Sequence, residues 1–191
     1  MGENNNFFAE CFGFQNPALS EMLARSAVME QIKRGTHVVE SGAVQQSVLL
    51  VISGVFRGFL VDENGCEMTD CFAFRQGDAV IGCNRFEEPS MVDFEALTDC
   101  VVLNLPVSCL KEAMMCFPEM SLFYNECLLE ALERHWKIKR IMYRPALERY
   151  QWFLKEYPGL VNMVSHKLIA SFLGITPVTL SRLRHQVRET I

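Results

Sequence analysis

The sequence lacks the features by which several large classes of protein are recognised. No run of eighteen uncharged apolar residues occurs, which argues against a membrane-spanning helix. The N-terminus lacks the basic start and apolar stretch of a signal peptide, so we expect a cytoplasmic protein with no membrane partner. No Gly-x-Ser-x-Gly, P-loop or His-Glu-x-x-His motif is present, so the commonest hydrolase, nucleotide-binding and metalloprotease signatures are missing.

Cysteine and histidine occur, but not in the patterns that bind metal. The eight cysteines include no Cys-x-x-Cys pair, and their scattered spacing does not fit a zinc or iron–sulfur site. Because cytosolic proteins rarely keep disulfides, we expect most of these cysteines to be small apolar core residues. Between residues 30 and 106 His37 is the sole histidine, and metal-dependent barrel enzymes use two or three. We therefore expect no metal and no catalytic residue.

Charge is distributed unevenly along the chain. Residues 1–133 contain 7 Lys+Arg and 20 Asp+Glu, whereas residues 134–191 contain 11 and 3. The net charge of −5 thus combines an acidic region of −13 with a basic region of +8. Double-stranded DNA attracts the basic region and repels the acidic one, so the C-terminal part is expected to face phosphate.

The N-terminal half predicts helices followed by β-structure. Apolar spacing in residues 7–29 indicates one or two short helices. Over residues 30–106, β-branched and aromatic runs alternate with glycine turns, which is typical of an antiparallel sandwich or barrel. The clearest hairpin pairs residues 55–61 with 66–74 across an Asp-Glu-Asn-Gly turn, because Asn-Gly readily adopts positive φ angles.

Helical spacing replaces the glycine turns after Pro106. A short helix is expected over residues 108–115, ended by Pro118, and a long helix over residues 119–142 with a broad apolar stripe. Such a stripe suits dimerisation, although packing within one chain stays open as an alternative. The residues expected at the dimer interface are Phe123, Tyr124, Cys127, Leu128, Ala131, Leu132 and His135.

The strongest signal is a helix-turn-helix over residues 165–187. Gly174 permits a left-handed residue in the turn between two helices. Thr176 is a good N-cap for the second helix, and Pro177 suits the first helical position because its missing N–H costs nothing there. Apolar residues at i, i+3 and i+7 from Leu180 supply a buried face, and polar side chains on the other face suit base edges and phosphates.

This segment resembles the helix-turn-helix of the Crp/Fnr family of transcription regulators, through Ile-Ala-Ser-x-Leu-Gly-Ile-Thr-x-x-Thr-Leu-Ser-Arg at residues 169–182. The preceding region is similar to the cyclic-nucleotide-binding-like domain of that family. The similar segments are Lys33-Arg34-Gly35, Glu40-Ser41-Gly42, Val51-Ile52-Ser53-Gly54, Gly77-Asp78 and Glu95-Ala96-Leu97-Thr98-Asp99.

The resemblance implies an α+β fold in three parts. These are an antiparallel β jelly-roll or barrel sensor domain (residues 1–118), a linking and dimerisation helix (119–143) and a helical helix-turn-helix domain (144–191). Because the sequence stops at Ile191, soon after the second helix, we expect the β-wing of the family to be short or absent.

The resemblance also implies how the second helix reads DNA. Arg182 is expected to reach a base edge, with Val178 and Ser181 lining the same groove and Thr179 near the backbone. Val178 stands where many relatives carry a polar or acidic base reader, so specificity there would rest on a thymine methyl. The full expected set is Lys167, Thr176, Val178, Thr179, Ser181, Arg182, Arg184, His185 and Arg188. For its basic members, a merely solvated helix face remains the alternative.

The expected effector pocket departs from the family pattern. Relatives that bind cyclic AMP hold its phosphate with a Gly-Glu pair and a later Arg-Ser or Arg-Thr pair. Here Gly82 is followed by Cys83, and Pro89-Ser90 stands where the arginine pair is expected. We therefore expect no cofactor, and either an effector other than cyclic AMP or none. The residues expected to line the pocket are Arg75, Gly82, Cys83, Asn84 and Ser90.

These observations predict a homodimeric transcription regulator that binds double-stranded DNA and is not an enzyme. Two recognition helices about one DNA turn apart would select a pseudo-palindromic operator. RNA polymerase is a further candidate partner. Two alternatives stay open: an enzyme built on a cupin-like barrel, and an interaction protein whose DNA reader is vestigial.

Overall fold

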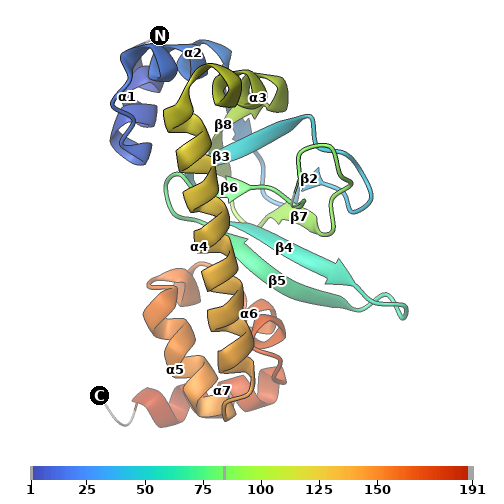
Figure 1. Ribbon diagram of the computed structural model, residues 1–191. Coiled ribbons are helices and arrows are strands. Elements are labelled where there is room, and N and C mark those ends of the chain that lie inside the picture. Colours follow the sequence, from blue (N-terminus) through green and yellow to red (C-terminus); the bar gives the residue numbers. More distant parts are fainter. Residues whose placement is uncertain (1, 84, 189–191) are drawn as a thin grey trace. The chain divides into compact units, whose positions relative to one another are not determined.

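Two short helices precede the strands in the computed structural model, which describes residues 2–83 and 85–188 (Figure 1). Helix α1 spans Gly2–Phe12 and α2 spans Pro17–Ser26. The Asn16 side chain accepts a hydrogen bond from the Ala18 N–H, and proline follows it at the start of the helix. Both residue types favour a helix start, so the sequence itself defines where α2 begins.

Eight strands in the described part of the chain form an antiparallel β-sandwich of two four-stranded sheets. The strand orders are β1-β8-β3-β6 and β2-β7-β4-β5. The strands are β1 (Val28–Ile32), β2 (His37–Val39), β3 (Ser47–Ser53), β4 (Phe56–Val61), β5 (Glu67–Ala73), β6 (Ala79–Val80), β7 (Asp93–Ala96) and β8 (Cys100–Pro106). The predicted hairpin is confirmed as β4 and β5, with Gly65 at a φ of 76° in its turn.

One apolar core joins the short helices to strands β3 and β8. Helix α3 (Val107–Cys116) follows β8 directly, and Pro118 begins α4 (Pro118–Met142). Leu23, Leu103 and Leu110 are buried together in this core. Removal of these side chains from water holds the helices against the sheet.

Fewer cysteines belong to the core than the composition predicted. Cys100 and Cys109 are buried, whereas Cys66, Cys116 and Cys127 are exposed and the other three are half-buried. The expectation that most of them are core residues is therefore wrong. Cys66 lies beside the hairpin turn, Cys116 ends α3 and Cys127 lies on α4. The sequence around each of them does not indicate whether the cysteine is buried.

The C-terminal helices pack around a cluster of aromatic rings. Helix α5 spans Ala146–Glu156, a 3-10 turn spans Leu160–Asn162, α6 spans His166–Phe172 and α7 spans Pro177–Arg188. Phe153, Tyr157 and Phe172 are buried with ring centroids 5.1–5.8 Å apart. Among the described helices, none combines the length and the apolarity that a membrane span requires.

Packing divides the chain into two compact units that cut across the expected domain boundaries. The first contains Met1–Gly58 and Phe72–Leu128, and the second contains Phe59–Cys71 and Leu129–Ile191. The expected boundaries followed the order of elements, whereas the units follow contacts. Part of the β4–β5 hairpin belongs to the second unit, where the backbone N–H of Thr69 donates to Ser171 Oγ on α6 at 2.9 Å.

Candidate nucleic-acid interface

The turn between α6 and α7 has the geometry that the sequence predicted. Gly174 has a φ of 62°, a left-handed conformation that side-chain-bearing residues rarely adopt. Thr176 Oγ1 accepts a hydrogen bond from the Thr179 N–H at 3.1 Å, so it caps the start of α7. The cap and the glycine turn together determine where the second helix begins.

One side of α7 packs against the rest of the second unit. Leu180 is fully buried, beside the equally buried Ile169 and Leu173. Leu183 and Val187 are half-buried, in agreement with the predicted inner face. The opposite side of α7 is therefore held outward.

The outward side presents the residues expected to read DNA. Val178, Ser181, Arg182 and His185 are all exposed, Val178 being 62% exposed. Their spacing of i, i+3, i+4 and i+7 places them on one face of the helix. We call these four residues the recognition face. Thr179 is half-buried at the edge of this face, and its hydroxyl lies 2.9 Å from Thr176 Oγ1.

The expected phosphate contacts have different surroundings. Lys167 is exposed at the start of α6. Arg184 is half-buried, and its Nη1 lies 2.9 Å from His166 Nδ1, so this arginine faces α6 and lies off the recognition face. The Arg188 side chain and Asn84 lie outside the described residues, as does the segment 189–191 on which the expectation about the wing falls.

Arg149 on α5 is a structural residue of the interface that sequence patterns missed. Its Nη1 donates to the carbonyl oxygens of Leu173 at 2.7 Å and Gly174 at 3.3 Å, and its Nε donates to the Arg144 carbonyl at 3.0 Å. One guanidinium thus joins the helix-turn-helix turn to the segment between α4 and α5. No local signal identifies it, because the turn carbonyls are 24 and 25 residues away in sequence.

We expect Arg149→Ala to lower the free energy of unfolding by about 2–3 kcal/mol, because carbonyls at the end of α6 lose a charged donor. Urea unfolding of the variant measures this change. Arg149→Lys should recover only part of the loss, since lysine lacks the planar fork that serves several carbonyls at once. Gln151→Ala, at an exposed position of the same helix, is the matched control. Equal stability of the two alanine variants would contradict the role of Arg149.

Part of the predicted dimer interface is occupied within the chain. The Phe123 ring packs 5.2 Å from Phe12 and 5.0 Å from Phe14, and Tyr124 packs 5.4 Å from Phe86 (centroid distances). The remaining predicted residues are exposed on α4: Cys127, Leu128, Ala131, Leu132 and His135.

A second set of exposed apolar residues on α4 repeats every seven positions. We call Leu122, Leu129, Trp136 and Tyr143 the heptad stripe; Tyr143 follows directly after the helix, and all four are 52–82% exposed. Seven-residue spacing of apolar side chains is the pattern by which two helices pack along each other. The sequence contained this signal, but the broad stripe predicted above centres on another side of the helix.

The expected effector pocket is internally hydrogen-bonded where the structure describes it. The Gly82 N–H donates to Gln45 Oε1 at 2.7 Å, and the buried Ser90 hydroxyl donates to the Val92 carbonyl at 2.6 Å. Burial raises the pKa of the Cys83 thiol above its ordinary value, so this cysteine stays protonated near neutral pH. The Gly82 amide and the Ser90 hydroxyl, which could donate hydrogen bonds to an anion, thus already donate to groups of the protein.

Two arginines of the sandwich have partners of their own. Arg75 is exposed and its guanidinium lies 5.3 Å from the centroid of the Phe74 ring. Arg57 on β4 is buried, only 2% exposed, and its Nη1 lies 2.8 Å from Glu95 Oε1 on β7. A buried charge requires such a partner, and the sequence did not reveal this pair because its members are 38 residues apart.

Gly82→Ala should lower the free energy of unfolding by about 1–3 kcal/mol, as overpacking does. A Cβ at this position would lie 1.9 Å from Ser90 Oγ. We expect Ser90→Ala in the same chain to restore part of the loss, which a double-mutant cycle in urea measures. A Gly82→Ala protein as stable as the wild type would instead indicate room for an effector at this position.

Comparison with known proteins rests on the fold. No protein-family model and no curated protein matches this chain. Solved structures that match it over most of its length are regulators of the Crp/Fnr family.

Three of these structures illustrate the likeness. FixK2 from Bradyrhizobium japonicum is 20% identical, with a TM-score of 0.78 over 86% of this chain and 85% of that one. A protein described as a Crp/Fnr-family transcriptional regulator from Eubacterium rectale is 19% identical, with a TM-score of 0.70 over 97% and 88%. The catabolite activator protein of Thermus thermophilus is 19% identical, with a TM-score of 0.58 over 94% and 86%. At this identity the likeness establishes the fold: a β-sandwich, a long helix and C-terminal helices.

Proposed function

We propose that this chain is a sequence-specific DNA-binding transcription regulator of the Crp/Fnr type that acts in the cytoplasm and has no catalytic role. The observation that carries the proposal is the recognition face of α7. Its residues lie on the outward side of a helix whose start is capped by Thr176 and whose preceding turn is held by Arg149. Preorganised side chains of this kind suit base edges in a major groove.

In this proposal Arg182 contacts a base edge, with Val178 and Ser181 beside it in the same groove. Thr176, Thr179, Lys167 and His185 contact the sugar-phosphate backbone, and Arg184 supports α7 through His166. The net charge of +8 over residues 134–191 favours this approach to DNA over one through the acidic remainder of the chain.

The active form is a homodimer that packs along α4. The heptad stripe and Leu132 supply an apolar surface for a second copy of the same helix. A two-fold dimer would place two α7 helices on half-sites about one DNA turn apart, so the operator would be pseudo-palindromic. RNA polymerase is the natural further partner of a regulator bound to such a site.

Regulation does not use cyclic AMP in this proposal. The Gly82 amide is taken by Gln45 and the Ser90 hydroxyl by Val92, so the backbone and hydroxyl donors for a phosphate are occupied. Pro89 replaces the arginine that would neutralise the anion. The effector is therefore a different small molecule, or control by a ligand has been lost.

Selection of bound sequences from random duplex DNA tests the function. The expected result is an enriched two-fold motif with half-sites about 10 base pairs apart, and affinity that falls as salt rises. Repeating the selection with a metabolite pool tests control by an effector. The absence of any salt-dependent affinity for duplex DNA would overturn the proposal and favour an interaction protein with a vestigial reader.

A further inference from the structure

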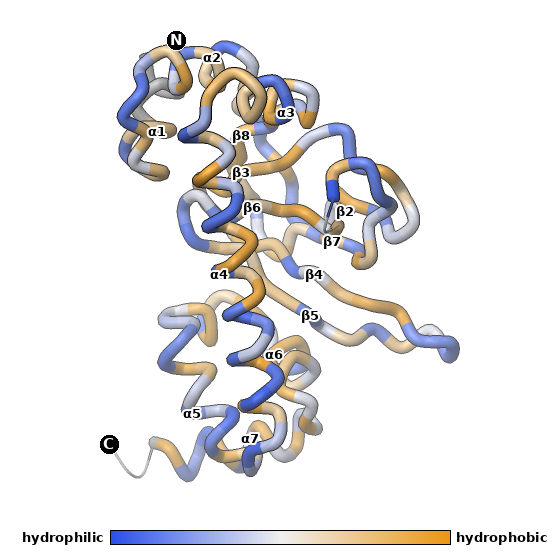
Figure 2. Tube along the Cα trace, in the orientation of Figure 1, coloured by the Kyte–Doolittle hydropathy of each residue, from blue (hydrophilic) through white to orange (hydrophobic). Residues whose placement is uncertain are grey.

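Three cationic side chains line a shallow groove where α4 meets α5. Lys137 and Arg140 lie one turn apart near the end of α4, and Arg144 follows in the segment that leads to α5. With Ile141 and Trp152 they surround a volume of about 320 Å³. Figure 2 shows hydrophilic residues predominating in this last part of α4. We call Lys137, Arg140 and Arg144 the basic stripe.

Positive charge in the groove is only partly neutralised. Lys137 Nζ lies 3.9 Å from Glu133 and Arg144 Nε lies 2.8 Å from Glu148, both at exposed positions. No carboxylate pairs with Arg140 in the part of the chain that the structure describes. A groove with an excess of exposed cations attracts a polyanion.

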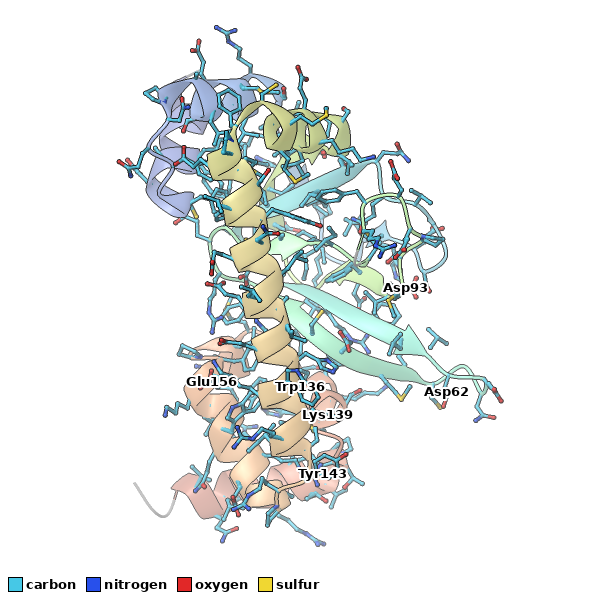
Figure 3. All side chains as sticks on the ribbon, viewed as in Figure 1. Asp62, Asp93, Trp136, Lys139, Tyr143 and Glu156 are labelled. Carbon is cyan, nitrogen blue, oxygen red and sulfur yellow. The ribbon has the colours of Figure 1, made fainter. Side chains whose placement is uncertain are left out.

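A further cation lies beside the groove on α4. Lys139 Nζ lies 4.9 Å from the centroid of the Trp136 ring, and both residues are labelled in Figure 3. The lysine is a cation–π partner of the ring and adds to the positive field of this helix end.

Hydrogen bonds of Arg149 place one end of the groove beside the helix-turn-helix. The Arg149 guanidinium binds the Arg144 carbonyl and also the carbonyls of Leu173 and Gly174. The segment at Arg144 and the turn at Gly174 are therefore separated by the width of one guanidinium group. Gly174 leads into the N-terminal end of α7, the part of a recognition helix that contacts bases. A duplex that receives α7 therefore passes close to the basic stripe.

The dimer proposed above leaves two residues of the basic stripe, Lys137 and Arg144, uncovered. Successive residues of an α-helix are rotated by about 100°, so Lys137 and Arg144 point away from their neighbours Trp136 and Tyr143 in the heptad stripe. A second copy packed along the heptad stripe would therefore leave Lys137 and Arg144 facing outward, whereas Arg140, four residues after Trp136 and three before Tyr143, lies at the edge of the heptad stripe. Lys137 and Arg144 thus stay available to DNA, and Arg140 borders the two surfaces.

We propose that the basic stripe is a second DNA-contacting surface, which binds the sugar-phosphate backbone next to the site read by α7. This inference rests on the proposed function and extends it beyond the helix-turn-helix. Lys137 and Arg140 span about one helical turn, and Arg144 continues the positive surface toward α7. Contacts to phosphate position the protein and strengthen binding without reading sequence.

The test is the double variant Lys137→Gln/Arg140→Gln, with fluorescence anisotropy as the measurement. The probes are the duplex selected by the wild-type protein and a scrambled duplex of equal length, titrated at several salt concentrations. Each lost phosphate contact lowers the salt slope by about 0.9, so we expect the slope to fall by about 2 and affinity at 0.1 M salt to fall by about 60-fold on both duplexes. Lys137→Gln alone, expected to lower the slope by about 0.9, serves where the double variant is unstable.

Lys33→Gln/Arg34→Gln removes the same charge at exposed positions in the first unit and should leave both affinities unchanged. If the wild-type protein binds DNA and the Lys137/Arg140 variant has the same salt slope, the basic stripe does not contact DNA. The proposed function would then still stand. A loss of affinity on the selected duplex alone would indicate that these residues read bases. An altered sedimentation coefficient would indicate that they contact a second copy of the chain. Either result overturns the proposal. A wild-type protein with no salt-dependent binding overturns both proposals.

Discussion

Leu129→Lys/Trp136→Lys should yield a monomer that no longer binds its two-fold operator tightly. Both residues are more than half exposed in the single chain, so the variant is expected to fold. In a dimer packed along α4 the same positions would bury four unpaired ammonium groups, and uncompensated buried charges cost several kcal/mol each. Loss of the second half-site then removes the gain from bivalent binding, about 10²–10⁴-fold in affinity.

Sedimentation velocity measures the oligomeric state, and anisotropy with the selected duplex measures affinity. Ala131→Lys is the informative comparison, because this residue is exposed on another side of α4 and belongs to the interface expected from the sequence. Dissociation by Ala131→Lys alone would show that the broad apolar stripe predicted from the sequence carries the dimer. A wild-type protein that is monomeric at every concentration would overturn the dimer itself.

Arg182→Ala is expected to cost about 1–3 kcal/mol of binding free energy on the selected duplex, or roughly 5- to 150-fold, and much less on a scrambled duplex. The reason is that a guanidinium on the recognition face can form paired hydrogen bonds with a guanine edge, which only the correct base offers. A new selection with the variant should return a motif degenerate at one position in each half-site.

Arg184 provides a matched control two residues along the same helix. Because its guanidinium contacts His166, Arg184→Ala should change the stability of the helix-turn-helix more than its base preference. If Arg182→Ala weakened both duplexes equally, the residue would contact phosphate alone, and base reading would have to lie elsewhere on α7.

Much of the fold was predictable because its signals are local. Asn64 and Gly65 mark the hairpin turn, Pro118 marks the break before α4, and Thr176 with Pro177 marks the start of α7. Each of these depends on the φ angle or hydrogen-bonding capacity of one or two neighbouring residues. Such preferences act within a few positions, so the sequence expresses them directly.

The contacts around the candidate interface were not predictable in the same way. Arg149 has the sequence context of an ordinary surface cation, and its partners on the turn lie in another helix pair. Arg57 and Glu95 belong to two separate strands, and nothing near Gln45 in the sequence indicates that it occupies the Gly82 amide. Each pairing depends on where distant segments meet, which residue type alone does not specify.

Local chemistry therefore determined the main secondary-structure elements, the helix-turn-helix and the polarity of charge along the chain. Folding decided which arginine binds the carbonyls of the turn, which one lies against His166, and which side chains of α4 stay exposed. The physical reason is range: backbone preferences act over neighbouring residues, whereas burial and hydrogen bonding depend on side chains that only the packed chain brings within a few ångströms of one another.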